Sequence, residues 1–157
     1  MLKMIMIHLS LLMINSLIGV VLYRFLNKKR EKLTQSRRMA MGSLASILSL
    51  NSGMNIYFLL PENVSVIYVL TVVIGGLIGA IYGSLVTPKA RLSGFYHGVI
   101  GGIMGTMLGA VIQNPSLCSL PSAHPNTIDE NIMLFSTFGI FLMITPALLL
   151  FEGGKKL

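Results

Sequence analysis

The sequence predicts an all-α fold, a polytopic membrane helical bundle of about five transmembrane helices with its N-terminus outside and its C-terminus inside. Three observations predict this fold. Apolar residues make up 54% of the chain and charged residues only 11%. Apolar runs at about 4–23, 40–60, 64–87, 95–113 and 132–151 each approach the roughly 20 residues that a helix needs to cross a bilayer. Nearly all lysines and arginines lie in alternate connections between those runs.

This composition suits a single integral membrane domain over residues 1–157. A soluble domain carries about 25% charged residues, whereas this chain, with a mean hydropathy of +0.78, lacks the charge to cover a water-facing surface. The net charge of +7 does not indicate nucleic acid binding, because the basic residues lie between apolar runs. There they set topology and contact anionic headgroups. The lipid bilayer is the expected partner, and nucleic acid is not.

The first run, 4–23, is predicted to be a span that is kept in the protein. It contains no charge, and Arg24, Lys28 and Lys29 follow it. A cleaved signal peptide carries its positive charge mainly before the apolar stretch and ends in small residues at the cleavage site. Here the charge follows the run and no such site is evident, so we expect an uncleaved helix.

The second run, 40–60, is the most polar of the five. Its serines and asparagines are Ser43, Ser46, Ser49, Asn51, Ser52 and Asn55. Polar side chains in a span need protein neighbours on most sides, since lipid offers them no hydrogen bonds. We expect this helix to be surrounded by protein, and whether it crosses fully is left open.

The third and fourth runs carry glycines at a spacing of four residues. The repeats are Gly75, Gly79 and Gly83, then Gly94, Gly98 and Gly102, and an offset set of Gly101, Gly105 and Gly109. Residues four apart lie along one ridge of a helix, where the missing side chains let another backbone come close. The glycines of the fourth run span a face about 100° wide, which is too wide for one neighbour. Packing within the chain, a homo-oligomer and a surface that slides during gating all remain open.

The last run, 132–151, follows the longest outer connection. That connection extends from Asn114 to Asn131 and contains Pro115, Pro121 and Pro125. Proline restricts its own backbone and that of the preceding residue. We therefore expect this connection to be extended or turned rather than helical.

The distribution of basic residues predicts the orientation. With five spans and the N-terminus outside, the cytoplasmic segments are 24–39, 88–94 and 152–157. They hold eleven of the 12 lysines and arginines, and the outer segments hold only Lys3. Cytoplasmic segments of membrane proteins carry such an excess. If the second run did not cross, the later basic residues would fall on the wrong side.

One segment carries a resemblance to known proteins. Ser93-Gly94-Phe95-Tyr96-His97-Gly98, followed by Gly101-Gly102-Ile103-Met104-Gly105-Thr106-Met107-Leu108-Gly109, resembles the Gly/Met-rich helix of certain small, uncharacterised, multi-spanning bacterial membrane proteins. The resemblance implies a bacterial plasma (inner) membrane location. It implies no activity, and it assigns no role to any residue.

The spans contain little that could perform catalysis. No Asp, Glu, Lys or Arg lies deep in a predicted span, whereas proton relays and ion-coupled carriers usually place such a group there. The histidines His8 and His97 fall at opposite leaflets in the predicted topology, so they cannot act together. We therefore predict that the chain is not an enzyme, and we predict no catalytic residue.

The sequence offers one candidate metal site. The chain has 11 methionines, and thioether and imidazole groups suit Cu(I). Met4 and His8 are about 6 Å apart along a helix, so the two side chains could share one ion. The competing interpretation is that the methionines are flexible packing groups, in which case no metal or other cofactor is bound.

Together these features favour a non-enzymatic membrane protein, an accessory or assembly protein that contacts a second copy or another membrane protein through its helices. The alternative is a small transporter or channel-like permeation protein, with a soft metal such as copper as one cargo. Glycine ridges that face outward would favour assembly. A polar cavity between the second and fourth spans would favour permeation.

Overall fold

The computed structural model describes residues 2–28, 35–60, 64–118 and 125–152. Helices account for nearly all of these residues and none of them forms a strand, so the all-α prediction is confirmed. In chain order the helices are α1 (Leu2–Lys28), α2 (Gln35–Leu59), α3 (Val64–Ser84), α4 (Pro88–Gln113), the short 3₁₀ helix η2 (Pro115–Cys118) and α5 (Pro125–Glu152).

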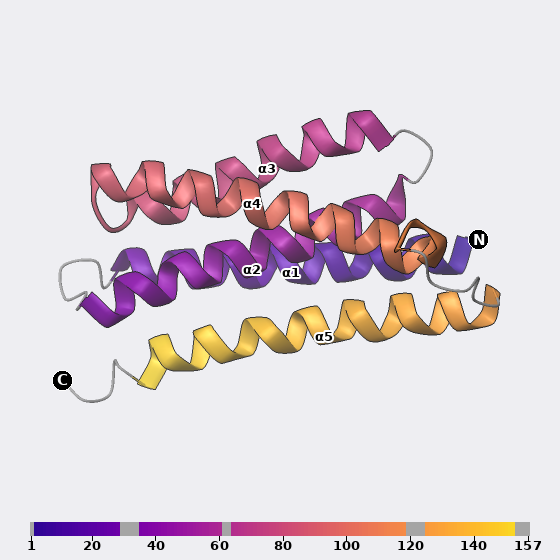
Figure 1. Cartoon of the computed structure of the whole chain (residues 1–157). Coiled ribbons are helices and arrows are strands. Elements are labelled where there is room, and N and C mark those ends of the chain that lie inside the picture. Colours follow the sequence, from indigo (N-terminus) through magenta and orange to yellow (C-terminus); the bar gives the residue numbers. More distant parts are fainter. Residues whose placement is uncertain (1, 29–34, 61–63, 119–124, 153–157) are drawn as a thin grey trace.

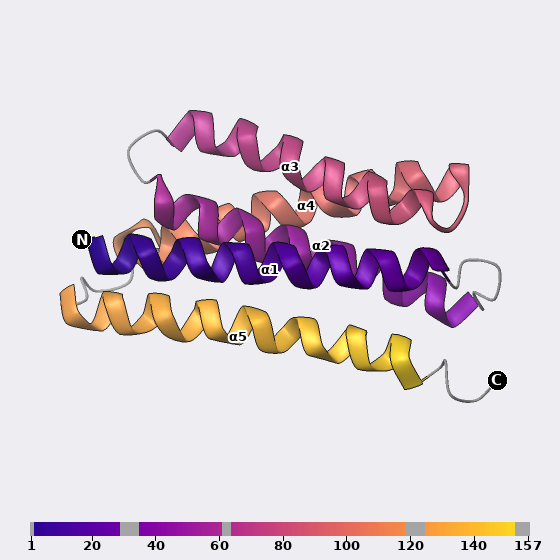
Figure 2. The same cartoon turned by 180° about the vertical axis from the view of Figure 1, so that it is seen from behind.

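Helix α2 lies at the centre of the bundle. The hairpin of α3 and α4 lies along one flank of α2, and α5 lies along the other (Figure 1). The view from behind shows α1 crossing in front of α2 (Figure 2). Helix α2 contacts each of the other four long helices. Protein therefore surrounds α2 on most sides, as its polar sequence leads us to expect.

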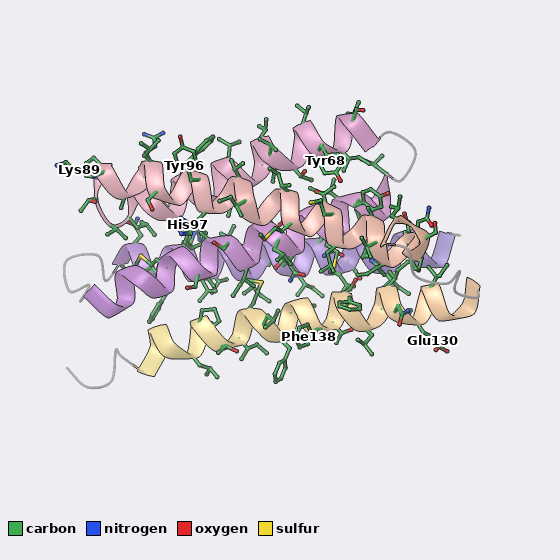
Figure 3. All side chains as sticks on the ribbon, in the orientation of Figure 1. Tyr68, Lys89, Tyr96, His97, Glu130 and Phe138 are labelled. Atoms are coloured by element: carbon green, nitrogen blue, oxygen red, sulfur yellow. The ribbon has the colours of Figure 1, made fainter. Side chains whose placement is uncertain are left out.

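The two ends of the bundle differ in charge. Helices α1 and α3 finish at one end, where α2 and α4 begin (Figure 1). Lys28 and Lys89 lie there, and we call it the basic end. Helices α1 and α5 begin at the opposite end, which we call the amino-terminal end. Lys89 and Glu130 mark these two ends in Figure 3.

Helix α4 begins at Pro88, ahead of the predicted run at 95–113, so residues 88–94, which we predicted to be a cytoplasmic segment, are helical. The hydroxyl of Thr87 accepts a hydrogen bond from the backbone N–H of Ala90 at 3.1 Å and caps the helix. Pro88 follows in the first turn, where a backbone N–H would lack a partner within the helix anyway. The 26 residues of α4 extend about 39 Å, against the ~30 Å hydrocarbon core of a bilayer. Lys89 can therefore lie outside the hydrocarbon although it is helical.

Helix α5 also begins earlier than predicted, at Pro125 rather than near 132. The same preference of proline for the first helical turn explains the difference, and the prediction of an extended segment is wrong from 125 onward. Residues Pro115 to Cys118 form η2. The part of the predicted connection that contains Pro121 and His124 lies outside the described residues.

Large apolar side chains cover the outside of the bundle. Met6, Val69 and Phe141 are 64%, 66% and 67% exposed, and Phe138 of α5 points away from the other helices (Figure 3). Soluble proteins rarely expose apolar patches beyond a few hundred Å². Helices α1, α3, α4 and α5 are long and apolar enough to cross a membrane. These are the features of a membrane protein.

Helix α2 is not among those four helices, so the count of five spans stays a prediction. Its described part exposes no large apolar side chain, and Met41, Leu44 and Met54 are almost completely buried. A helix that protein surrounds on most sides does not need an apolar surface to lie inside a bilayer. The length and central position of α2 are therefore better evidence on whether it crosses the membrane than its hydropathy is.

The interior contains two apolar clusters with polar residues between them. The basic-end cluster consists of Leu22, Leu26, Met41, Leu44, Ala45, Leu48, Tyr82, Leu85 and Met143. The amino-end cluster consists of Met54, Ile56, Tyr57, Phe58, Ile67, Ala110, Ile112 and Ile132. Several buried polar side chains of α2 lie between these clusters or beside the amino-end cluster. They form part of the candidate site.

Candidate functional site

The glycine ridges of α3 and α4 face each other. A Cβ atom built on Gly79 would lie within 3.0 Å of the carbonyl group of Gly94, and one built on Gly94 would overlap the carbonyl oxygen of Gly79. The same reciprocal relationship joins Gly75 and Gly98. Because real Cβ atoms do not approach a backbone so closely, only glycine permits this separation of the helices. Close approach of this kind is the main source of helix association in a bilayer.

The second ridge of α4 faces α2. A Cβ atom on Gly101 would lie 2.6 Å from the carbonyl oxygen of Ser46, and one on Gly105 would overlap the backbone of Leu50. The wide glycine face of α4 therefore serves two neighbours from the same chain. Eight of the nine glycines singled out in the sequence lie against the backbone of another helix in this way: Gly75, Gly79, Gly83, Gly94, Gly98, Gly101, Gly102 and Gly105. A Cβ atom on the ninth, Gly109, would lie 3.2 Å from the side chain of Tyr57.

Hydroxyl groups link the helices around these contacts. Among the described residues, hydroxyl groups donate three hydrogen bonds between helices: Ser49 donates to the carbonyl of Gly98, Thr106 donates to Thr71 at 2.9 Å, and Tyr82 donates to the carbonyl of Gly19 at 2.6 Å. They connect α2 with α4, α4 with α3, and α3 with α1. Each polar group thereby gains a partner that lipid could not provide.

A groove of about 820 Å³ lies between α2, α3 and α4 toward the basic end. Its polar lining includes Ser46, Ser93 and His97, and His97 lies on the side of α4 that faces α2 (Figure 3). The Nδ1 atom of His97 is 2.8 Å from the carbonyl oxygen of Ser93. A carbonyl only accepts, so Nδ1 donates, and in the neutral ring Nε2 keeps its lone pair for a ligand. We call this space the inner groove.

Five buried polar side chains occupy the other side of α2, where it meets α1 and α5. We call them the polar seam: His8 and Asn15 of α1, Asn51 and Asn55 of α2, and Ser136 of α5. Each is only 1% to 3% exposed. Asn15 is the middle residue of α1, so the seam reaches from the amino-terminal end to half the depth of the bundle.

Contacts between α1 and α2 hold the residues of the seam at two levels of the bundle. The ring centroids of His8 and Phe58 are 5.1 Å apart, and Asn55 is the polar neighbour of His8. Deeper in the bundle, the Nδ2 atom of Asn15 lies 3.4 Å from the hydroxyl of Ser52. Helix α5 contacts α2 at the level of Asn51.

Gly139 of α5 makes room for the side chain of Asn51. A Cβ atom built on Gly139 would overlap the Asn51 amide, which is therefore pressed against the backbone of α5. Ser136 lies three residues earlier in α5, on the same side of the helix. Helices α2 and α5 thus bring an amide and a hydroxyl group to the same side of their contact.

Most polar atoms of the seam have no hydrogen-bond partner within the described residues. They are His8 Nδ1, Asn15 Oδ1, Asn51 Oδ1 and Nδ2, Asn55 Oδ1 and Ser136 Oγ. Buried polar atoms are nearly always hydrogen-bonded in proteins, and in hydrocarbon an unpaired one costs several kcal/mol. The seam therefore has the character of a binding site.

The candidate copper site is only partly described. His8 lies in the bundle interior beside Phe58 and Asn55, neither of which contributes sulfur. The side chain of Met4 lies outside the described residues, so its pairing with His8 stays a prediction. Among the residues that the structure describes, His, Cys, Asp and Glu form no group of three or more that could hold a metal ion.

Sequence reasoning missed three residues of the seam region. Asn15, Ser136 and Gly139 are isolated polar or small residues in apolar runs, and each is unremarkable alone. A signal was present, because Asn15 lies seven residues after His8 and therefore on the same face of a helix. What the sequence lacks is the pairing of α1 with α2 and α5, which places that face opposite Asn51 and Asn55.

Comparisons with known proteins found no matching family model, no matching curated protein and no matching solved structure. The polar seam and the inner groove therefore have to be interpreted from their own chemistry.

Proposed function

We propose that this chain is a non-enzymatic protein of the bacterial plasma membrane that binds a small polar solute or ion within the bilayer and lets it permeate. The proposal includes five crossings, with the N-terminus outside and the basic end in the cytoplasm. The polar seam carries the proposal, because its unpaired atoms lie where a membrane protein has most reason to avoid them. Polar groups at such depth are typical of transport pathways.

The relative positions of the seam and the inner groove support permeation. The seam lies toward the amino-terminal end on the side of α1 and α5, whereas the groove lies toward the basic end on the side of α3 and α4. Ser46 in the groove and Asn51 in the seam are separated by about 7.5 Å of rise and about 140° around α2. The basic-end cluster fills the interior between the seam and the basic end. Two half-pathways with a closed barrier between them are what an alternating or gated protein requires.

An accessory or assembly role has less support. Its main argument was that the glycine ridges need a partner, and the ridges lie against helices of the same chain. A second copy or another membrane protein would have to bind elsewhere on the bundle. A permeation protein was expected to have a polar cavity between the second and fourth spans; the inner groove lies there, with Ser46, Ser93 and His97 in a lining that is otherwise mainly apolar.

Reconstitution tests this proposal with two neighbouring residues of α5. Purified chain in proteoliposomes is loaded with a panel of small solutes and monovalent ions, and efflux is followed against empty liposomes. Ser136→Ala removes a seam hydroxyl with an unpaired oxygen. Thr137→Val is the matched control, because the exposed Thr137 hydroxyl already bonds the carbonyl of Met133 at 2.8 Å.

We expect the wild-type chain and Thr137→Val to pass at least one member of the panel at similar rates, and Ser136→Ala to change that rate several-fold. Equal leakage from protein-containing and empty liposomes across the panel would refute permeation. Equal efflux rates for Ser136→Ala and Thr137→Val would show that the seam is not part of the permeation pathway.

A further inference from the structure

The hydrogen bonds around the polar seam determine which atoms of its asparagines point into it. Asn55 Nδ2 lies 2.9 Å from the carbonyl oxygen of Asn51. A carbonyl can only accept, so the amide nitrogen is the bonded atom, and the amide oxygen of Asn55 is left for contacts within the seam, where its polar neighbour is His8. The orientation of Asn55 is thereby fixed by chemistry.

The hydroxyl of Ser52 fixes the orientation of Asn15. The hydroxyl of Ser52 donates its single hydrogen to the carbonyl of Leu48 at 2.8 Å. It can therefore only accept from Asn15, whose Nδ2 atom lies 3.4 Å away. The amide oxygen of Asn15 is left free in its turn. Two oxygens that can only accept thus remain buried without a donor.

From this arrangement we infer that the polar seam binds a hard monovalent cation, Na⁺ or K⁺, through the side-chain oxygens of Asn15, Asn51, Asn55 and Ser136. The inference rests on the proposed function and names the class of cargo. A cation satisfies several acceptors at once without supplying a hydrogen to each. Neutral amide and hydroxyl oxygens are hard ligands, whereas soft ions such as Cu(I) prefer sulfur.

The charge of the site favours a monovalent over a divalent ion. Calcium and magnesium sites in proteins use carboxylates, and no carboxylate belongs to the seam. A doubly charged ion buried among neutral ligands would keep most of its charge uncompensated, which is very costly in a low-dielectric interior. A single positive charge among four oxygens is the less expensive arrangement.

The tightness of the seam limits the size of the occupant. The five seam side chains are at least 97% buried, and the Asn51 amide lies against the backbone at Gly139. A dehydrated ion is the smallest of the candidate occupants, whereas a larger organic solute would have to push the helices apart. Ordered water is the competing occupant, since it too donates to free oxygens.

A cation-replacement experiment separates these occupants. The full chain in detergent or nanodiscs is unfolded thermally in NaCl, KCl or N-methylglucamine chloride at equal ionic strength, and ²²Na⁺ binding is measured in parallel. We expect a saturable rise of the midpoint by several degrees in NaCl or KCl, and none in N-methylglucamine chloride. Such a rise is the linkage expected of a ligand that binds only the folded state.

Asn51→Leu should abolish both the saturable rise and ²²Na⁺ binding, while Thr137→Val should keep both. Equal midpoints in all three salts, together with no ²²Na⁺ binding, would overturn the cation inference and leave water as the occupant. A saturable rise that persists in Asn51→Leu would also overturn it. Cation binding without efflux from proteoliposomes would contradict the proposed permeation but not the cation site. Efflux of an uncharged solute without cation binding would contradict the cation site but not permeation.

Discussion

Gly79 of α3 and Gly94 of α4 each occupy the space that a side chain on the other would need. A Cβ atom on either glycine would overlap the carbonyl oxygen of its partner. The reciprocity means that the contact is made by two backbones, which also allows weak Cα–H···O interactions across it. Because this pair lies inside one chain, it serves the fold rather than assembly.

Replacing either glycine of this pair should weaken the hairpin of α3 and α4. Gly79→Ala forces the helices apart, and overpacking of this kind costs about 1–3 kcal/mol. Gly42→Ala is the matched control, because nothing lies within 4 Å of a Cβ atom at that position. Alanine there should leave stability unchanged or raise it by up to about 1 kcal/mol through its better helix propensity.

The measurement is reversible unfolding of both variants in mixed detergent micelles, followed by circular dichroism. A Gly79→Ala protein as stable as Gly42→Ala would show that the two backbones are not in contact in the membrane.

The glycine pattern shows what sequence can and cannot supply. A repeat of four residues is enough to place Gly94, Gly98 and Gly102 on one ridge, and the width of the α4 glycine face indicates more than one neighbour. The identity of those neighbours depends on how the chain folds back, which no local pattern encodes. The start of α5 differs from the prediction for another reason, since Pro125 is taken as a sign of an extended or turned connection although proline also favours the first helical turn.

Tyr82→Phe should loosen the contact between α3 and α1. It removes the hydrogen bond to the carbonyl of Gly19 at 2.6 Å but keeps the ring in the basic-end cluster. Such a bond contributes about 0.5–1.5 kcal/mol. Tyr96→Phe is the control, because Tyr96 is 59% exposed on the outside of α4 (Figure 3). Equal unfolding midpoints for the two variants would show that this hydrogen bond does not stabilise the contact between α3 and α1.

Asn51→Leu should stabilise the protein in the absence of alkali cations. Both polar atoms of the Asn51 amide lack a partner, and burying an unpaired polar group costs about 1–3 kcal/mol. Leucine has a similar shape and carries no such cost. Unfolding in N-methylglucamine chloride measures the effect. A marked loss of stability would mean that the Asn51 amide already has partners that hold α2 against α5.

Thr71 and Thr106 should be energetically coupled. Their hydroxyls are 2.9 Å apart between α3 and α4, and both side chains are essentially buried. Hydrogen bonds between membrane helices average about 0.6 kcal/mol in double-mutant cycles. A cycle with Thr71→Val, Thr106→Val and the double variant should give a coupling energy of that size and favourable sign. A coupling of zero would indicate that each hydroxyl is satisfied within its own helix, through the carbonyls of Ile67 and Gly102.

Only part of the polar seam could be predicted from the sequence. The serines and asparagines of α2 correctly indicated a helix that needs protein neighbours. The other half of the seam, Asn15 and Ser136, comes from two separate apolar runs in which a single polar residue carries little information. The pairing of these residues follows from the packing of α1 and α5 on α2, and the glycine that admits the Asn51 amide is visible only at that contact.

In the proposed topology, α2 crosses the membrane as the polar core of a five-helix bundle. The most direct test of this topology is the side on which each end of α2 lies. Cys118 is the sole cysteine, so Cys118→Ser gives a background into which Asn27→Cys and Leu60→Cys are introduced singly. A membrane-impermeant maleimide, applied to intact cells, to inverted vesicles and to permeabilised cells, reports the side of each position. We expect Leu60→Cys to react in intact cells and Asn27→Cys only in inverted vesicles or after permeabilisation. Labelling of both positions from the same side would contradict the account, because α2 would then not cross.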